Sequence, residues 1–449
     1  MRWFIIFFLV LTVSIIGFSV PNPTSIVGRL ISSDPLDADD ERVIFTGTPL
    51  SDGGTVVAGW RKDQFMGWVR PSVWKLNPDG TPDTSFNAGL GFYEFDYGGT
   101  VWDVHEHTDG GLTISGYTGW FNGVPKKTNG EITISKLTAD GTPDNTFSSD
   151  GTAVFDLAGG DDDALAHHVL EDGNILVVGE SRQGEKDDTF ILKASSTGQL
   201  DLSFGSGSGS VIHDFSPGED DAAISVNVDA GGRIYILGWA QSNVSESEYY
   251  YLARFRSDGT LDTSYGDGDG WVDLTALTDE DEFWPSHHLF VAEDGTAWPG
   301  LSGTQLTGGW RNQFFSLTPE GHLDKSFADN GLMTYISPQS PHVEASITAF
   351  TIAGKNLYAV ETLSSEDGDG GSNNVLSFDL TTGEIDRHFG TNGNFHAADN
   401  IQVILGHNDG MVFAAGSTPS LSGNVTVIDV NTAPSTISAV TTTDERYDG

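Results

Sequence analysis

DGTPDTSF, at residues 79 to 86, is one of six copies of an eight-residue phrase that recurs along this chain. The other copies are DGTPDNTF (140–147), TGQLDLSF (197–204), DGTLDTSY (258–265), EGHLDKSF (320–327) and TGEIDRHF (382–389). The glycines at the second position of successive copies are separated by 61, 57, 61, 62 and 62 residues. A period near sixty residues, built from turn residues and short apolar runs, is typical of a repeat architecture.

A second phrase alternates with the first and joins an Asp-Gly or Gly-Gly turn to a short apolar strand. Its seven copies are DGGTVVAG (52–59), DGGLTISG (109–116), DGNILVVG (172–179), GGRIYILG (231–238), DGTAWPG (294–300), AGKNLYAV (353–360) and DGMVFAAG (409–416). Asp-Gly supplies the positive φ angles of tight hairpin turns, and the β-branched and aromatic residues that follow favour strands. Each repeat therefore predicts four antiparallel strands, which in the third repeat are residues 164–171, 174–179, 189–195 and 209–215. This is the pattern of a β-propeller blade, and a linear β-array is the alternative.

The two ends of the chain decide between a ring and an array. The seventh unit has three strands, the last at 425–431, and lacks a fourth, whereas a strand without a repeat of its own stands at 25–31. A ring gains from this arrangement because the N-terminal strand completes the last blade and removes exposed sheet edges. We therefore predict an all-β fold, a seven-bladed β-propeller of four-stranded antiparallel blades closed by the N-terminal strand. Six or eight blades are less favoured.

The two phrases together resemble the bacterial delta-sixty repeat, over roughly residues 25 to 431. The resemblance is weaker at DGTAWPGL (294–301) and AGKNLYAV (353–360), where the strand phrase is broken. It implies a propeller fold and a secreted or cell-surface protein, and it says little about activity because a fold does not dictate chemistry.

The ends of the chain differ from the repeats. Residues 1–20 hold a single arginine followed by an apolar run, which predicts a secretory signal peptide; a retained membrane anchor is the alternative. Residues 21–431 then form a single propeller domain and 432–449 a C-terminal tail. We expect the protein to be secreted, or to lie at the cell surface or in the periplasm.

The chain is strongly acidic, with 64 acidic and 21 basic residues and a net charge of -43. Such a charge disfavours nucleic acid and an anionic membrane surface as partners, because both require basic patches. The chain has no cysteine, which excludes disulfides and cysteine-based sites. We expect a monomer with a glycan or an extracellular protein as its partner.

Candidate binding and catalytic residues lie in the parts of the repeat that differ between blades. Second strands end in Trp60, Tyr117 and Trp239, which are candidate ligand-binding residues. Inner strands carry His105, His168 and His288, which are candidate catalytic residues. We expect these groups, with the acids of the blade-to-blade loops, to surround one mouth of the central channel. The alternative is that they pack between blades.

The repeated aspartates of the first phrase are better explained by structure than by metal binding. Asp83, Asp144, Asp201, Asp262, Asp324 and Asp386 are expected to hydrogen-bond the backbone of their own turns. The Asp-Gly-Asp-Gly runs at 267–270 and 367–370 resemble fragments of calcium loops without the full ligand set. A structural Ca²⁺ is therefore the one cofactor considered, and the metal ligands stay unassigned.

Two functional classes follow. The first is an extracellular binding or surface-interaction module for a glycan or protein. The second is a secreted polysaccharide-degrading enzyme, a lyase or glycosidase, with histidine and carboxylates at the channel mouth. The sequence favours the first and does not name the ligand.

The diffuse negative charge generates a testable prediction. Self-repulsion among the acidic groups is weakened by salt, so the melting temperature of the mature protein should rise from dilute buffer to molar sodium chloride. A flat or falling melting temperature over that range would show that the acidity does not limit stability.

Overall fold

The computed structural model describes residues 27–29, 41–62, 69–77, 81–119, 130–157, 159–242, 248–278, 282–304, 310–338, 344–364, 372–387, 389, 394–397, 403–406, 411–417 and 423–429. Among these residues, no helix is long and apolar enough to cross a membrane. The predicted leader at 1–20 and the tail at 432–449 lie outside the described residues.

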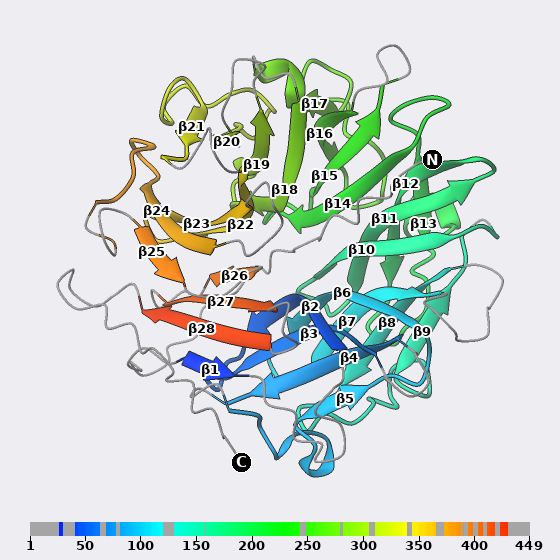
Figure 1. Cartoon of the computed structure of the whole chain (residues 1–449). Helices are drawn as coiled ribbons and strands as arrows, with labels where there is room; N and C mark the ends of the chain where they lie inside the picture. The colour runs from blue at the N-terminus through cyan, green and yellow to red at the C-terminus, as the bar shows by residue number, and fades with distance from the viewer. Residues whose placement is uncertain are drawn as a thin grey trace.

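The described chain consists mainly of strands in four-stranded antiparallel sheets, which are arranged around a common centre (Figure 1). In six of the sheets, four consecutive strands pair in chain order. The first strand of such a sheet lies toward the centre and the fourth toward the periphery (Figure 1). This is the architecture of a β-propeller, and the six sheets are called blades 1 to 6 in chain order.

Blade 1 contains β2 (Glu41–Pro49), β3 (Thr55–Lys62), β4 (Val69–Leu76) and β5 (Phe92–Glu94). Blade 2 contains β6 (Gly99–Glu106), β7 (Leu112–Thr118), β8 (Glu131–Leu137) and β9 (Thr152–Phe155). Blade 3 contains β10 (Asp162–Val169), β11 (Ile175–Gln183), β12 (Lys186–Ala194) and β13 (Ser210–His213). Blade 4 contains β14 (Asp221–Val228), β15 (Ile234–Gln241), β16 (Glu248–Phe255) and β17 (Trp271–Asp273).

Blade 5 contains β18 (Glu282–Val291), β19 (Ala297–Thr304), β20 (Trp310–Phe315) and β21 (Leu332–Ile336). Blade 6 contains β22 (Glu344–Ala353), β23 (Asn356–Ser364), β24 (Ser372–Asp379) and β25 (Asn394–Ala397). Short 3-10 helices lie in the connections at Phe86–Gly89, Gly205–Gly207 and Thr275–Leu277. The four strands predicted for the third repeat are confirmed, with shifts of a few residues at their ends.

A further sheet joins the two ends of the chain. It contains β26 (Val403–Gly406), β27 (Met411–Ser417) and β28 (Gly423–Asp429), and its outer strand is β1 (Val27–Arg29). Val27, Gly28 and Arg29 pair with Thr426, Val425 and Asn424 in antiparallel register. The sequence prediction that the N-terminal strand pairs with the last strand is confirmed at these residues. This closing sheet contacts blade 6 through β22 and blade 1 through β2.

The hydrophobic core lies between neighbouring blades. Val56 and Val73 of blade 1, for example, share one buried cluster with Val101 and Ile114 of blade 2. A four-stranded sheet exposes two apolar faces, and each face is buried here by the blade that lies on that side. Single blades therefore depend on their neighbours for most of their apolar burial.

The aspartate of the first phrase caps its own turn, as predicted. Asp83 accepts hydrogen bonds at Oδ1 from the backbone N–H (2.9 Å) and the hydroxyl (2.6 Å) of Ser85. The same pair of bonds recurs at Asp144, Asp201, Asp262 and Asp324, each with the Ser or Thr two residues later. The structural interpretation of these five aspartates is therefore confirmed.

From blade 1 to blade 5, the aromatic residue that ends the first phrase links one blade to the next. A Cβ on Gly259 of blade 4, whose φ is +85°, would lie 2.7 Å from the ring of Phe204 of blade 3. The N–H of Gly205, next to that ring, donates to the carbonyl of Asp258 over 3.0 Å. Gly141 meets Phe86 and Gly321 meets Tyr265 in the same way. Glycine is thus required here for its positive φ and for the close approach of the ring.

Replacing this glycine should be costly. Gly259→Ala should lower the free energy of unfolding by roughly 2–4 kcal/mol, because it adds a clash with Phe204 to the strain of a positive φ. Gly184→Ala is the matched control: its φ is +75° and its Cβ would meet nothing within 4 Å, so about 1 kcal/mol is expected. Urea unfolding measures both. Equal losses in the two variants would show that the ring contact does not constrain the turn.

Candidate functional site

The strands of each blade have two distinct ends. The hairpin turns between first and second strands, and the connections between third and fourth strands, lie at one end, which we call the turn end. The loops between second and third strands and between blades lie at the other, which we call the loop end. Both repeated phrases lie at the turn end, so the residues that differ between blades gather at the loop end.

The three predicted aromatic residues lie at the loop end of blades 1, 2 and 4. Trp60, Tyr117 and Trp239 each follow the glycine of the strand phrase and pair with the start of the inner strand. All three are partly exposed. Trp239 also packs its apolar side against the core of blades 3 to 5. Their shared register gives three aromatic side chains at equivalent places on three blades.

Blade 3 carries a carboxylate at this register, which was not predicted from the sequence. Glu180 follows Gly179 as Tyr117 follows Gly116 and Trp239 follows Gly238. Its direct cross-strand partner is Asp163. Alignment of the seven strand phrases would have found Glu180, but it would not have shown that Asp163 lies opposite.

Asp163 and Glu180 form a coupled acidic pair. Directly opposed side chains in an antiparallel pair have Cβ atoms about 5 Å apart, so two negative charges there repel strongly. Burial, followed by the charges of Asp161 and other acids, raises the pKa of Asp163 to about 7. Burial, followed by the charge of Asp163, raises the pKa of Glu180 well above its ordinary value. At neutral pH the pair therefore tends to share one proton.

Tyr117 of blade 2 lies close enough to this pair for the charges of Asp163 and Glu180 to act on its hydroxyl. Burial raises the pKa of its hydroxyl well above its ordinary value, and the charges of Asp163, Glu180 and Asp161 add to the effect. The hydroxyl therefore stays protonated at neutral pH and can donate a hydrogen bond. A Cβ on Gly130 would lie 3.3 Å from Oδ1 of Asp163, so glycine leaves room for that carboxylate.

Arg182 lies near the acidic pair, and a second cation, Lys186, lies at the same end of blade 3. Arg182 binds Asp187 through two parallel hydrogen bonds of 2.6 and 2.9 Å. Lys186 binds Glu219 over 2.7 Å and lies 3.6 Å from Asp220. These bonds fix part of the loop end of blades 3 and 4, and the remaining acids keep this surface negative.

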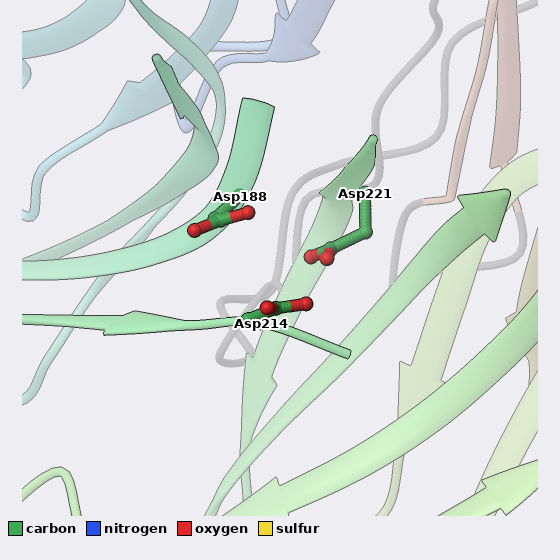
Figure 2. A group of neighbouring side chains, drawn as sticks. All are labelled: Asp188, Asp214 and Asp221. Atoms are coloured by element: carbon green, nitrogen blue, oxygen red, sulfur yellow. The ribbon is translucent and has the colours of Figure 1, made fainter. Parts of the chain in front are cut away.

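Asp188, Asp214 and Asp221 bring three carboxylates within 4.8 Å of one another, as Figure 2 shows. Asp221 is fully buried, and its oxygens accept bonds from the backbone N–H groups of Thr189, Phe215 and Ser216. Burial raises its pKa to about 6 despite these bonds. A carboxylate engaged by three N–H groups is better explained as a cap on the blade 3 to blade 4 loop than as a ligand for Ca²⁺.

The predicted histidines lie away from the aromatic residues, which corrects the expectation of a single mouth. His105 and His168 stand five residues beyond Thr100 and Asp163 on their inner strands, about 16 Å further along. They therefore lie near the turn end, because an inner strand runs from the loop end to the turn end. His288 lies in β18, and its side chain is outside the described residues.

The histidines of blades 2 and 3 form a cluster of rings near the turn end. The ring centroids of His105 and His167 lie 6.5 Å apart. Burial, followed by the charges of neighbouring histidines, lowers the pKa of His105 well below its ordinary value. Burial and His167 lower the pKa of His168 to about 4. The lowered pKa values keep His105 and His168 neutral at pH 7, and two neutral imidazoles between blades fit the packing alternative better than an acid–base role.

Buried Asp103, Ser115 and His167 contain the residue types of a nucleophilic triad but lack its geometry. Ser115 Oγ and Asp103 Oδ2 both lie at Nδ1 of His167, at 2.8 and 2.9 Å. A nucleophile and an orienting acid must bind opposite ring nitrogens. Nε2 of His167 has no hydrogen-bond partner among the described residues. The cluster is therefore a buried link between blades 2 and 3.

Comparison with known families supports the fold. A family described as a domain of unknown function (DUF5122) beta-propeller matches residues 50–86, 170–204 and 232–265. These segments cover the second and third strands and the following turn of blades 1, 3 and 4. The chain is similar to this family in those segments, and the description names no activity. No curated protein matches the chain.

Solved structures are similar at the level of the overall fold. The beta-propeller domain of the Trilobed protease from Pyrococcus furiosus is 12% identical, with a TM-score of 0.42, over 89% of this chain and 98% of that one. Drosophila Semaphorin 1b, extracellular domains 1-2, is 8% identical, with a TM-score of 0.44, over 90% and 87%. A GH43 endo-arabinanase from Bacillus licheniformis is 14% identical, with a TM-score of 0.30, over 59% and 92%. Likenesses this distant carry no argument about function.

The acidic pair generates a prediction about pH. The raised pKa values of Asp163 and Glu180 give a contribution to stability that is present below about pH 4 and is lost as pH rises through those raised values, which for Asp163 is about 7. Glu180→Gln removes the repulsion, so its free energy of unfolding should fall less than the parent's between pH 5 and 8, by on the order of 1–2 kcal/mol.

Glu171→Gln, at an exposed turn-end position of the same blade, removes the same charge and should follow the parent. Because the histidines are unchanged in all three proteins, their opposite pH dependence cancels in the comparison. Parallel stability curves for the parent and Glu180→Gln would contradict the coupling of the pair.

Proposed function

We propose that this chain is a secreted delta-sixty repeat protein that acts as a monomeric extracellular binding module for a glycan. In this proposal the closing sheet is the seventh blade, and β1 completes the ring. The pairing of β1 with β28 and the contacts of β26 with blades 1 and 6 support the ring. The apolar leader at 1–20 supports export.

The observation that carries the binding function is the shared register of Trp60, Tyr117 and Trp239. Aromatic side chains at equivalent loop-end positions can present apolar faces to a ligand while the blades hold them rigidly. Glu180 occupies the same register between two of them and can accept hydrogen bonds from ligand hydroxyls. We call Trp60, Tyr117, Glu180 and Trp239 together the arc. Sugar rings offer both the apolar C–H faces and the hydroxyls that the arc would recognise.

The charge of the protein narrows the class of glycan. A net charge of -43 repels anionic polysaccharides, and Asp161, Asp187 and Asp220 place part of that charge beside the arc. Neutral polysaccharides are therefore the favoured ligands.

Binding to a panel of neutral polysaccharides, measured by calorimetry on the mature protein, tests this function. Trp60→Ala and Trp239→Ala should each weaken binding by about tenfold or more, because each removes an aromatic contact face. Leu202→Ala is the control: Leu202 is 63% exposed but lies at the turn end of blade 3, and binding should not change. If the tryptophan variants fold and bind like the parent, the site lies elsewhere.

A second candidate function is polysaccharide cleavage, and the Asp163–Glu180 pair favours it. Two carboxylates with raised pKa values beside a tyrosine hydroxyl can supply a general acid at neutral pH. His105 and His168 lie near the other end of their blades, so they are too far away to take part in such a site. Product formation in the same panel would favour this candidate, and Asp163→Asn should then abolish turnover while binding persists.

A further inference from the structure

A cation binds the turn-phrase aspartate in several blades. Lys75 of blade 1 lies 3.3 Å from Asp83. Lys193 of blade 3 lies 3.0 Å from Asp201, and Arg254 of blade 4 lies 2.8 Å from Asp262. Each cation stands at the end of the third strand, and its carbonyl accepts a hydrogen bond from the N–H of that aspartate. The repeat therefore places one positive charge against each of these turn carboxylates.

Blade 6 replaces the cation with an amide. Ser377 stands where the lysine stands in blades 1 and 3, and its carbonyl accepts the N–H of Asp386 over 2.7 Å. Asn356 donates from Nδ2 to Oδ2 of Asp386 (3.0 Å) and to Oγ of Ser377 (2.8 Å). The serine is too short to reach the carboxylate of Asp386, and the amide of Asn356 binds that carboxylate in its place.

Blade 5 has the serine without the compensation. Ser316 stands at the lysine position, since its carbonyl accepts the N–H of Asp324 over 2.8 Å and its own N–H binds Gly331 as that of Lys75 binds Gly91. Its Cβ therefore points toward the turn carboxylate as that of Lys75 does. Ser316 is 1% exposed, and its Oγ has no hydrogen-bond partner among the described residues.

The carboxylate of Asp324 also has few hydrogen-bond partners. Among the described residues, its hydrogen bonds come from Ser326 alone, and both reach Oδ1. Asp294, the hairpin aspartate of blade 5, stands at the repeat position of Asp52, which binds Lys75 in blade 1 over 3.0 Å. Blade 5 thus keeps both carboxylate positions of the turn and lacks the ammonium group.

We propose that blade 5 binds a small inorganic cation between Asp324 and Ser316, in the space that a lysine side chain fills in blades 1 and 3. The donors are carboxylate and hydroxyl oxygens, which suit hard cations such as Na⁺ and Ca²⁺. A bound cation gives the buried Ser316 Oγ a partner and restores the positive charge that the repeat places at this turn.

The test compares melting temperatures of the full chain at one fixed ionic strength, with tetramethylammonium chloride replaced stepwise by NaCl or CaCl₂. The bulky organic cation screens charge but does not fit between two side chains. The parent should gain about 1–2 °C in the metal salt once the cation is in tenfold excess over its Kd. The salt that gives the gain at the lower concentration identifies the ion.

Variants separate this site from the other acidic groups. Ser316→Lys should melt higher than the parent in the organic salt and should lose the gain from the metal salt. Ser257→Lys, at an exposed turn of blade 4, adds the same charge and should keep the parent's gain. Asp324→Asn should lose the gain even if Ser316→Lys fails to fold.

Conversely, Lys193→Ser should create a second such site and enlarge the response of the protein to the metal cation. Equal gains in the parent, Ser316→Lys and Asp324→Asn would overturn the proposal. So would an absence of any difference between the metal and the organic salt in the parent.

Discussion

The contact between the aromatic side chain of one blade and the turn glycine of the next is the constraint on which the rest of the structure depends. Phe86, Phe204 and Tyr265 pack against Gly141, Gly259 and Gly321, where no side chain would fit. The residue after each ring donates its N–H to the carbonyl that precedes the glycine. From blade 1 to blade 5, this contact fixes the position of each blade against the next, so that the apolar faces between these blades meet in one register.

The loop end is free of this constraint, which explains why its side chains differ between blades. Tyr117, Glu180 and Trp239 stand at one register on three successive blades, and an acidic residue stands between two aromatic ones. A rigid turn end and a variable loop end separate the requirements of stability from those of recognition. Variation at the loop end can lower stability, as the coupled pair of Asp163 and Glu180 illustrates, because two opposed carboxylates destabilise the sheet that carries them.

The repeat made most of the fold predictable from the sequence, because the phrases encode local turns and strands. The capping role of Asp83 and the pairing of the N-terminal strand followed from turn chemistry and from the leftover strands. The position of His105 was predicted wrongly. His105 lies a few residues before the glycine of the hairpin turn, and a residue that close to the turn lies at the turn end of its strand. The Asp163–Glu180 pair also escaped prediction, because cross-strand register depends on a bulge between Ala164 and Ala166. The isolation of Ser316 became visible only when equivalent contacts of several blades were compared.

Native-state hydrogen exchange of the amides that donate across blades tests the central constraint most directly. Ser148, Gly205 and Gly266 donate to Thr197, Asp258 and Glu320 of the following blades. If these contacts hold the blades together, the amides exchange only through global unfolding, with the same denaturant dependence as Val177 in the buried strand β11. Exchange through local opening, fast and insensitive to denaturant, would show that the blades are held by their apolar faces alone.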